Sequence, residues 1–502
     1  MQASSSQVTV IGAGIGGLTA GALLAKRGYD VKIYDQAYVA GGCASTFKRR
    51  GFTFDVGATQ VAGLEPGGIH YQIFQELEID IPEFTPCDPA CAVYLPGESE
   101  PISVWRDPQQ WKAEREKQFP GSDRLWKTLN QLFQANWKFQ SRDPIIPPRN
   151  LWDIRKMVAA VRPDTLITVP YIFSTVGDLL KKYGLDGDRR LKTFLDLQLK
   201  LYSQVGADET ALLYAATALG ISQAPFGLAH LQGSMQVLAD VLVQSIQDNG
   251  GEVHLQHRVE SIQVEGKEAK AIALRNLRTD ETWEEPIHCL VTNVTVQDLV
   301  GLMGPKGPQS YSQRVKKLTK PSGAFVLYLG VKADAIPENC APHLQFLYDY
   351  DGPIGENNSL FISVSKQGDG RAPEGHSTIV ASSFTAADRW SQTTNYQDLK
   401  EEFTHTAIKQ LGQFFDLRPE HIVHQEAGTP RTFARFTGRA EGIVGGLGQR
   451  RLTFGPFGFS TRTPLKNLWL VGDSTHPGEG TAGVSYSAWS ATQQIEVSGI
   501  LS

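Results

Sequence analysis

The sequence predicts an α/β fold, α+β overall, because strand–turn–helix patterns stand near both ends of the chain and strand patterns fill part of its middle. Residues 7–35 read QVTVIGAGIGGLTAGALLAKRGYDVKIYD, which is an apolar strand, a glycine turn, a helix and a second strand. Residues 465–495 repeat the order of strand, glycine turn and helix. Runs such as GAFVLYLGV, SLFISVS and STIVASSF in the middle have the length and composition of strands. The two ends predict one Rossmann-type parallel sheet, and the middle predicts a second, mixed sheet.

The turn after the first strand has the pattern G-x-G-x-x-G. The pattern spans residues 12–17, and the residues predicted to contact the cofactor are Gly12, Gly14, Ile15, Gly16 and Gly17. The first glycine permits a tight turn, the second lets a pyrophosphate approach bare backbone, and the third lets the helix pack closely on the strand. Asp35 follows eighteen residues after Gly17, where a carboxylate accepts hydrogen bonds from a ribose. The segment therefore predicts a dinucleotide whose pyrophosphate lies at the helix N-terminus.

Two further glycine segments favour FAD over a nicotinamide dinucleotide. Gly41 and Gly42 lie six residues after Asp35, where the chain must pass close under an extended FAD. Near the other end, an apolar strand leads into Gly472 and Asp473, and the aspartate is predicted to bind the ribityl chain or the pyrophosphate. The helix that follows would direct its N–H groups at the flavin ring, where they stabilise negative charge. Its first residues are Thr481, Ala482, Gly483 and Val484.

Composition limits the other classes of function. A chain of 502 residues accommodates two or three domains, and its net charge of −5 gives no reason to expect a nucleic-acid partner. No apolar run reaches the length of a membrane span, and the N-terminal residues lack a secretion signal. The five cysteines are expected to be reduced thiols. Cys87 and Cys91 have no second ligand pair at metal spacing, so no metal site is predicted.

Three more stretches extend these motifs over nearly the whole chain: GGCASTFKRRGFTFDVGAT, LQGSMQVLADVLVQSIQDNGGEV and TPRTFARFTG. With them the chain resembles the carotenoid desaturase and isomerase branch, the phytoene-desaturase-like proteins, of the FAD-dependent amine-oxidase superfamily. Within that branch it is most similar to the cyanobacterial carotenoid 3′,4′-desaturases, with the prolycopene isomerases close behind. The resemblance implies FAD, a carotenoid substrate and backbone contacts to the adenine near Val259. Cys43 departs from the pattern, because many members have arginine there, so any flavin contact of that arginine is not carried over.

The order of the segments predicts a discontinuous FAD-binding domain, a substrate-binding domain with a mixed sheet, and a helical region that faces a membrane and admits the substrate. The FAD-binding domain comprises 1–80, 225–300 and 430–502, the substrate-binding domain 81–148 and 301–429, and the helical region 149–224.

A basic amphipathic helix is predicted at 149–162. Its apolar stripe consists of Leu151, Ile154, Val158 and Val161, with Trp152 near the stripe and basic residues flanking it. From the pattern alone, an ordinary surface helix packed on its own domain is favoured over one that lies in a membrane interface. The resemblance reverses this preference, because carotenoids reside in the bilayer. We therefore expect a protein bound peripherally to the cytoplasmic side of a membrane.

The leading function is FAD-dependent desaturation of a carotenoid by hydride transfer to the flavin, at the 3′,4′ position of an acyclic end. Oxygen or a quinone would then re-oxidise the flavin. One alternative is cis–trans isomerisation of a carotene, and a less favoured one is a non-catalytic prenyl-lipid carrier of the GDP-dissociation-inhibitor type, which shares the fold without using FAD. Two catalytic residues are predicted in STHPGEG. His476 is either a base beside the flavin or a structural residue of the turn, and Glu479 is a second candidate base.

Overall fold

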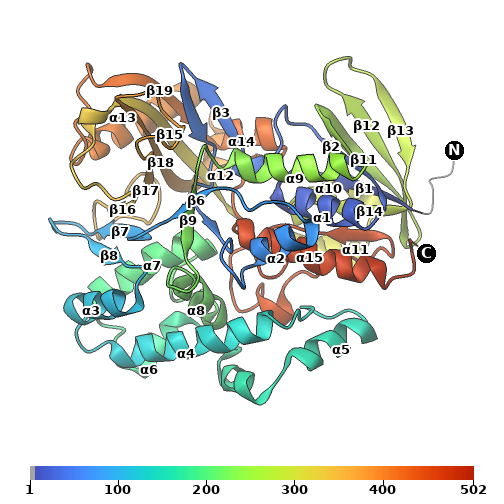
Figure 1. Ribbon diagram of the computed structural model, residues 1–502, viewed down its shortest axis with the longest axis horizontal. Coiled ribbons are helices and arrows are strands. Elements are labelled where there is room, and N and C mark those ends of the chain that lie inside the picture. The colour runs from blue at the N-terminus through green and yellow to red at the C-terminus, as the bar shows by residue number, and fades with distance from the viewer. Residues whose placement is uncertain (1–5, 502) are drawn as a thin grey trace.

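A parallel sheet assembled from distant parts of the chain forms one side of the molecule. The computed structural model describes residues 6–501. The sheet has five strands, all parallel to their neighbours, in the order β10-β2-β1-β14-β20 (Figure 1). They are β10 (Glu252–Leu255), β2 (Asp30–Asp35), β1 (Gln7–Ile11), β14 (Cys289–Thr292) and β20 (Leu468–Leu470). This arrangement is the Rossmann-type sheet that the two ends of the chain predict.

Helix α1 (Ile15–Lys26) lies at the centre of the helices that cover this sheet, and it is buried from Ile15 to Ala25. It packs against α2 (Ile69–Leu77), α9 (Gln236–Asp248) and α15 (Thr481–Glu496). Such close packing requires small residues, because a Cβ placed on Gly17 would lie 2.0 Å from the carbonyl oxygen of Gly12. The third glycine of the motif therefore fixes the distance between helix and strand, as predicted.

A second sheet, with seven strands in the order β19-β15-β18-β17-β16-β7-β8, confirms the predicted mixed sheet. Only the pair β16–β7 is parallel. The strands are β19 (Ile422–Gly428), β15 (Ser322–Lys332), β18 (His376–Ala386), β17 (Ser359–Val364), β16 (His343–Leu347), β7 (Cys91–Tyr94) and β8 (Ile102–Val104). Helix α13 (Tyr396–Leu411) covers it and buries Leu399, Phe403, Ala407 and Leu411. α12 (Ala387–Gln392) and α14 (Pro430–Thr437) lie beside it.

We call the parallel sheet with its helices and the mixed sheet with its helices the two units of the molecule. Smaller sheets accompany them. Beside the parallel sheet stand β11 (His257–Glu265), β12 (Glu268–Asn276) and β13 (Thr282–Pro286), with α10 (Val296–Met303) and α11 (Gln309–Lys316). Between the units run the hairpin β3 (Thr46–Arg49) and β4 (Phe52–Asp55) and the three-stranded sheet of β5 (Val61–Ala62), β9 (Leu228–Leu231) and β6 (Phe84–Pro86).

A layer of helices closes one edge of the molecule, at the bottom of Figure 1. It contains α3 (Pro108–Gln118), α4 (Asp123–Gln140), α5 (Leu151–Ala160), α6 (Val176–Lys182), α7 (Arg189–Ser203) and α8 (Leu212–Gly220). The predicted division assigns all of 81–148 to the substrate-binding domain. In the structure β7 and β8 join the mixed sheet, and their side chains share one hydrophobic core with α3, α4, α6, α7 and α8. Within residues 6–501, no helix has both the length and the apolar character that crossing a bilayer requires.

A buried ionic cluster fastens the two units together. Arg371 donates to Asp55 Oδ2 at 3.0 Å, and Asp55 Oδ1 accepts from the backbone N–H of Met235 at 2.8 Å. His230 Nε2 lies 2.8 Å from Asp369 Oδ2, beside the same guanidinium. Because these charged groups are enclosed, each depends on its partners, and the cluster fixes β4, β9 and the start of α9 relative to the mixed sheet.

Candidate functional site

One cavity of about 1130 Å³ lies where the parallel sheet, the mixed sheet and the helical layer meet. It is lined by most of the predicted site residues: Gly12, Gly14, Ile15, Gly16, Asp35, Gly41, Gly42, Val259, Asp473, His476, Glu479, Thr481, Ala482, Gly483 and Val484. Gly17 and Gly472 are not among its lining residues, because Gly17 packs on Gly12 and Gly472 packs beside Asn293. The structure thus brings segments more than four hundred residues apart to one cavity.

The glycine turn presents backbone N–H groups to the cavity. The N-cap residue of α1 is Gly14, which has no side chain of its own to cap the helix. The second glycine pair lies directly beside this turn, since Gly41 N–H donates to Ala13 O at 2.7 Å and a Cβ on Gly42 would lie 3.3 Å from Gly14 Cα. Free N–H groups and the positive end of the helix dipole form a site for an anionic diphosphate.

Asp35 stands at the end of β2, where a ribose of the dinucleotide is predicted. Its carboxylate accepts the N–H of Ala13 at 2.6 Å and that of Ala37 at 2.7 Å. Burial raises the pKa of Asp35, and these two N–H groups oppose the rise. Each carboxylate oxygen has a further lone pair, so the group can hold the turn and still accept from a ribose hydroxyl.

Two cavity residues were missed by sequence reasoning. Asn293 follows β14, and with Oδ1 facing the turn it accepts from the N–H groups of Gly14 and Gly17 at 3.3 Å. Arg439 donates to Asp473 Oδ2 at 2.7 Å and to Gly445 O at 3.0 Å. Burial opposes the charge of Arg439, but Asp473 outweighs it and keeps the pKa of the guanidinium above its ordinary value. The only sequence signal for Asn293 is its place at the end of a buried strand, and Arg439 has none.

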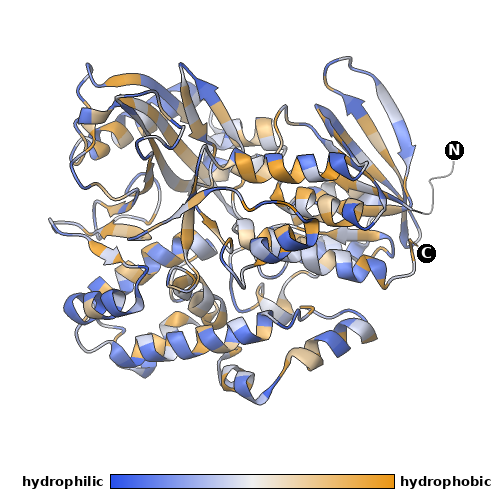
Figure 2. Cartoon of the chain, in the orientation of Figure 1, coloured by the Kyte–Doolittle hydropathy of each residue, from blue (hydrophilic) through white to orange (hydrophobic). Residues whose placement is uncertain are grey.

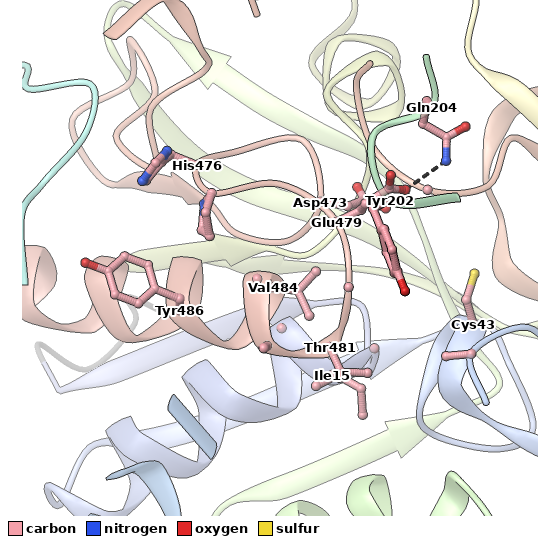
Figure 3. Close-up of a pocket in the computed structure, with 18 of the residues that line it drawn as sticks. Ile15, Cys43, Tyr202, Gln204, Asp473, His476, Glu479, Thr481, Val484 and Tyr486 are labelled. Carbon is pink, nitrogen blue, oxygen red and sulfur yellow. Dashed lines mark hydrogen bonds between the residues drawn. The ribbon is translucent and has the colours of Figure 1, made fainter. Parts of the chain in front are cut away.

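His476 lies on one side of the cavity, near Tyr486 (Figure 3). Its Nε2 is 2.9 Å from Gln140 Nε2, and its Nδ1 is buried without a hydrogen-bond partner. Burial lowers the pKa of His476 to about 4. The imidazole is therefore neutral at pH 7 and is a weak base.

Glu479 lies on the other side, close to Asp473 and Tyr202 (Figure 3). Its Oε2 accepts from Gln204 Nε2 at 2.8 Å, and its Oε1 is buried without a partner. Burial is the main cause that raises the pKa of Glu479 to about 8; the hydrogen bond from Gln204 opposes the rise and the neighbouring Asp473 adds to it. The side chain is thus a carboxyl group that changes its charge close to neutral pH.

Apolar side chains of the helical layer, the mixed sheet and α14 line much of the same cavity, and we call this part of it the apolar channel. Its lining includes Trp137, Phe139, Ile146, Met157, Leu201, Leu213, Ile221, Phe361, Phe384, Phe433 and Phe454. Three lining residues, Val161, Leu166 and Val169, are also exposed on the surface, by 44%, 52% and 54%. The channel therefore opens between α5 and the segment that follows it.

The surface around this opening is apolar, and we call its exposed side chains the apolar rim. The rim consists of Leu151, Ile154, Val158, Val161, Leu166, Ile167, Val169 and Phe173. Figure 2 shows hydrophobic residues along this edge of the molecule, in α5 and the turns after it. Asp153 lies on the buried side of α5, where its carboxylate is 3.2 Å from Arg462 Nε. The predicted apolar stripe of this helix thus faces outward, not toward its own domain.

Comparisons with known proteins agree with this geometry. Residues 10–77 match a family model described as an NAD(P)-binding Rossmann-like domain. Prolycopene isomerase 1, chloroplastic, from an Oncidium hybrid cultivar is 28% identical over 97% of this chain and 83% of its own. A 4,4′-diapophytoene desaturase (4,4′-diapolycopene-forming) from Methylomonas sp is 25% identical over 97% and 94%. The chain is a homologue of the carotenoid desaturases and isomerases.

Solved structures show that this homologue is also similar to known oxidoreductases in its fold. An oxidoreductase from Methanosarcina mazei has a TM-score of 0.64 at 18% identity, covering 97% of this chain and all of the other. Cyclohexylamine oxidase from Brevibacterium oxydans has a TM-score of 0.61 at 15% identity, covering 98% and 99%. The fold is that of the amine-oxidase-like oxidoreductases.

The residues of the cavity fit FAD, the cofactor predicted from the sequence for this homologue. Free N–H groups at α1 suit the diphosphate, and Asp35 suits a ribose. At the opposite end, the N-cap residue of α15 is Gly480, which provides no side-chain cap, so the first N–H groups of α15 are available to the flavin ring. Arg439 adds a guanidinium close to Cys43, the position at which the expected arginine is missing.

Arg439→Gln should lower the free energy of unfolding by about 3 kcal/mol, because it leaves the mostly buried Asp473 without its cation. Urea unfolding of the FAD-loaded protein measures this loss. Arg435→Gln is the matched control, since Arg435 lies in the same segment and is exposed. Equal losses in the two variants would contradict the role given to the Arg439–Asp473 pair.

Proposed function

We propose that the protein is an FAD-dependent carotenoid desaturase that removes two hydrogens at the 3′,4′ position of an acyclic end. The observation that supports it most directly is that one cavity contains both the dinucleotide residues and the apolar channel. A long polyene is an apolar ligand and suits walls of aromatic and aliphatic side chains. The 3′,4′ position rests on the resemblance of the sequence motifs to the cyanobacterial 3′,4′-desaturases.

The side chains of the cavity orient the substrate and exclude water. Bound FAD supplies an acceptor for the hydride that leaves the substrate. The aromatic and aliphatic walls hold the polyene in one orientation, which converts an encounter into a positioned reaction. The second hydrogen leaves as a proton, which a group of this chain or water accepts. His476 and Glu479 are the candidates.

Isomerisation of a carotene is the second candidate function. It is supported by the prolycopene isomerase of the Oncidium hybrid, which matches 97% of this chain. Isomerisation needs the same channel but no net removal of hydrogen. A carrier that does not use FAD is disfavoured by the complete set of glycines and by Asp35 at the dinucleotide end of the cavity.

Incubation of the FAD-loaded protein with acyclic and part-cyclised carotenes distinguishes these functions. We expect a product lighter by two hydrogens, formed with oxygen or with an added quinone as the electron acceptor. An unchanged mass with a changed chromatographic retention would identify an isomerase instead. A colourless protein that binds carotenes without converting them would identify a carrier.

We further propose that the protein binds peripherally to the cytoplasmic side of a membrane through the apolar rim. The support is the outward face of α5, where Leu151 is 80% and Val158 is 60% exposed. A carotenoid dissolved in a bilayer would then enter the channel between α5 and the residues after it without crossing water. Basic side chains beside the rim, Arg155 and Lys156, suit an anionic surface.

His476→Asn should keep FAD bound and slow anaerobic flavin reduction by roughly tenfold or less, below the usual contribution of a general base. The physical reason is that a buried imidazole with a pKa of about 4 is a weak proton acceptor. Stopped-flow absorbance with a carotenoid substrate measures the rate, and His405→Asn is the control, because His405 lies on the exposed side of α13. A thousandfold slower reduction with FAD in place would make His476 an essential catalytic residue.

A further inference from the structure

Two pairs of side chains in the cavity contain polar atoms that no other group satisfies. Among the described residues that line it, Gln140 Oε1, His476 Nδ1, Gln204 Oε1, Glu479 Oε1 and Gln297 Oε1 are buried and lack a hydrogen-bond partner. The first four atoms belong to the pairs Gln140–His476 and Gln204–Glu479. Each unsatisfied buried group costs about 1–3 kcal/mol, so a substrate-facing role is a physical reason for retaining them.

Gln204, which pairs with Glu479, has a backbone conformation that is unfavourable for a residue with a side chain. Gln204 is the residue after α7, and its φ of +65° lies in the left-handed region that disfavours a side chain. Lys200 Nζ donates to Gln204 O at 2.8 Å and keeps it there. Strained residues that the surrounding structure fixes in this way are concentrated at functional sites.

Gly445 completes the support of this pair. A Cβ at Gly445 would lie 2.2 Å from both Gln204 Nε2 and Glu479 Oε2. The Gln204 amide and the Glu479 carboxyl therefore pack against the backbone of Gly445, where no side chain would fit. One carboxyl oxygen is thus fixed by Gln204 and Gly445. The other oxygen, Oε1, has no hydrogen-bond partner, and Glu479 lines the cavity. Figure 3 shows the Gln204–Glu479 hydrogen bond beside Asp473 and Tyr202.

We propose that Glu479 is the catalytic residue that accepts the substrate proton and that Gln204 is its positioning residue, an inference that rests on the proposed desaturation. After a hydride has left one carbon, the C–H bond of the adjacent carbon breaks. Its electron pair forms the new C=C bond, and the proton bonds to Glu479 Oε1. One hydride and one proton account for the two hydrogens removed, and the carboxylate becomes the neutral acid.

The charges around Glu479 suit this task. It faces Lys200 of α7, Tyr214 of α8, Asp473 after β20 and, through Asp473, Arg439. Burial raises the pKa of Glu479 to about 8, whereas that of His476 falls to about 4. The Glu479 carboxylate is therefore the stronger base, although it is partly protonated at pH 7. A base with a pKa near the working pH is the most effective one.

The direction of the pH dependence follows from the charge that the reaction needs. A proton acceptor must be ionised, so the rate should rise about tenfold per pH unit below pH 8 and level off above it. An isomerase in which the neutral acid gives a proton to the polyene would show a rate that falls through the same range. The pH profile thus separates the two uses of one carboxyl group.

The test is single-turnover product formation by the FAD-loaded protein from pH 6 to 10, in wild type and in three variants. Glu479→Gln should be at least a hundredfold slower above pH 8 and should lose the rising limb. Gln204→Leu should keep the limb but move its midpoint to higher pH, because the amide N–H stabilises the carboxylate. Glu209→Gln, an exposed residue paired with Arg450, should match wild type.

A readout without turnover accompanies it. Infrared difference spectra of wild type minus Glu479→Gln at pH 7 should contain the C=O band of a neutral carboxylic acid, which disappears above pH 8. Turnover by Glu479→Gln within threefold of wild type, with the same pH profile, would overturn the inference and leave the desaturase function intact. If Glu479→Gln fails to bind FAD, an unmoved midpoint in Gln204→Leu overturns it. A wild type that removes no hydrogen from any carotene refutes the proposed function, and the inference with it.

Discussion

Gly14→Val should abolish FAD binding and, with it, all turnover. A Cβ on Gly14 would lie 2.6 Å from the side-chain amide of Asn293, below the closest approach that real Cβ atoms show. The φ of −74° at Gly14 suits valine, so the effect comes from space and not from backbone strain. The added methyl groups would also stand where the diphosphate reaches the N-terminus of α1, and overpacking by even one methylene is costly.

The ratio of flavin absorbance to protein measures the bound FAD of the Gly14→Val variant. Gly187→Val is the matched control, because a Cβ at Gly187 meets no atom within 4 Å and the residue lies outside the cavity. We expect the control to retain FAD in full. Stoichiometric FAD in Gly14→Val would show that the dinucleotide does not follow this turn.

Replacing Leu151, Val158 and Phe173 of the apolar rim by aspartate should abolish binding to liposomes. These side chains are 80%, 60% and 64% exposed, so the change costs little folding energy. Inserting them into a bilayer yields roughly 1.5–3 kcal/mol each, a combined loss of several powers of ten in affinity. Flotation with anionic and neutral liposomes measures it, while the flavin spectrum reports that the fold is intact.

Two comparisons make the membrane experiment specific. Leu277→Asp with Val497→Asp alters exposed apolar residues outside the rim and should leave flotation unchanged. Arg155→Glu with Lys156→Glu should weaken binding to anionic liposomes only, by about 1 kcal/mol for each basic residue lost. Unchanged flotation of the rim variant would mean that α5 and the residues after it have only a structural role.

The sequence predicts those parts of the fold whose requirements are local. The glycine turn before α1 is recognisable because Gly17 must lie against Gly12 in any such strand–helix unit. Helix α5 is predicted at 149–162 and observed at Leu151–Ala160, because Asn150 caps its start and Pro163 follows its end. The side of α5 that faces outward was not predictable from its pattern, since it depends on Asp153 meeting Arg462 from far along the chain.

The residues that sequence reasoning missed reach the site through tertiary packing. Gln204 has no motif of its own, and it becomes a site residue only where the end of α7 meets the turn before α15. Arg439 occurs in a loop after α14, and its contact with Asp473 joins segments that no pattern connects. Likewise the parallel pairing of β7 with β16 joins residues about 250 positions apart, so the predicted mixed sheet could not be given its strand order.

The position of β20 and α15 has a consequence for how the protein is made. During synthesis β1 and α1 leave the ribosome more than 440 residues before β20, the strand that completes their sheet. Until then β14 exposes an unpaired apolar edge, and such an edge invites aggregation. The dinucleotide site is complete only after α15 has been synthesised, so FAD can bind and stabilise the fold only at the end of synthesis. Free FAD at a hundred times its dissociation constant would add about 2.7 kcal/mol to the finished fold, so flavin supply should govern the yield of soluble protein.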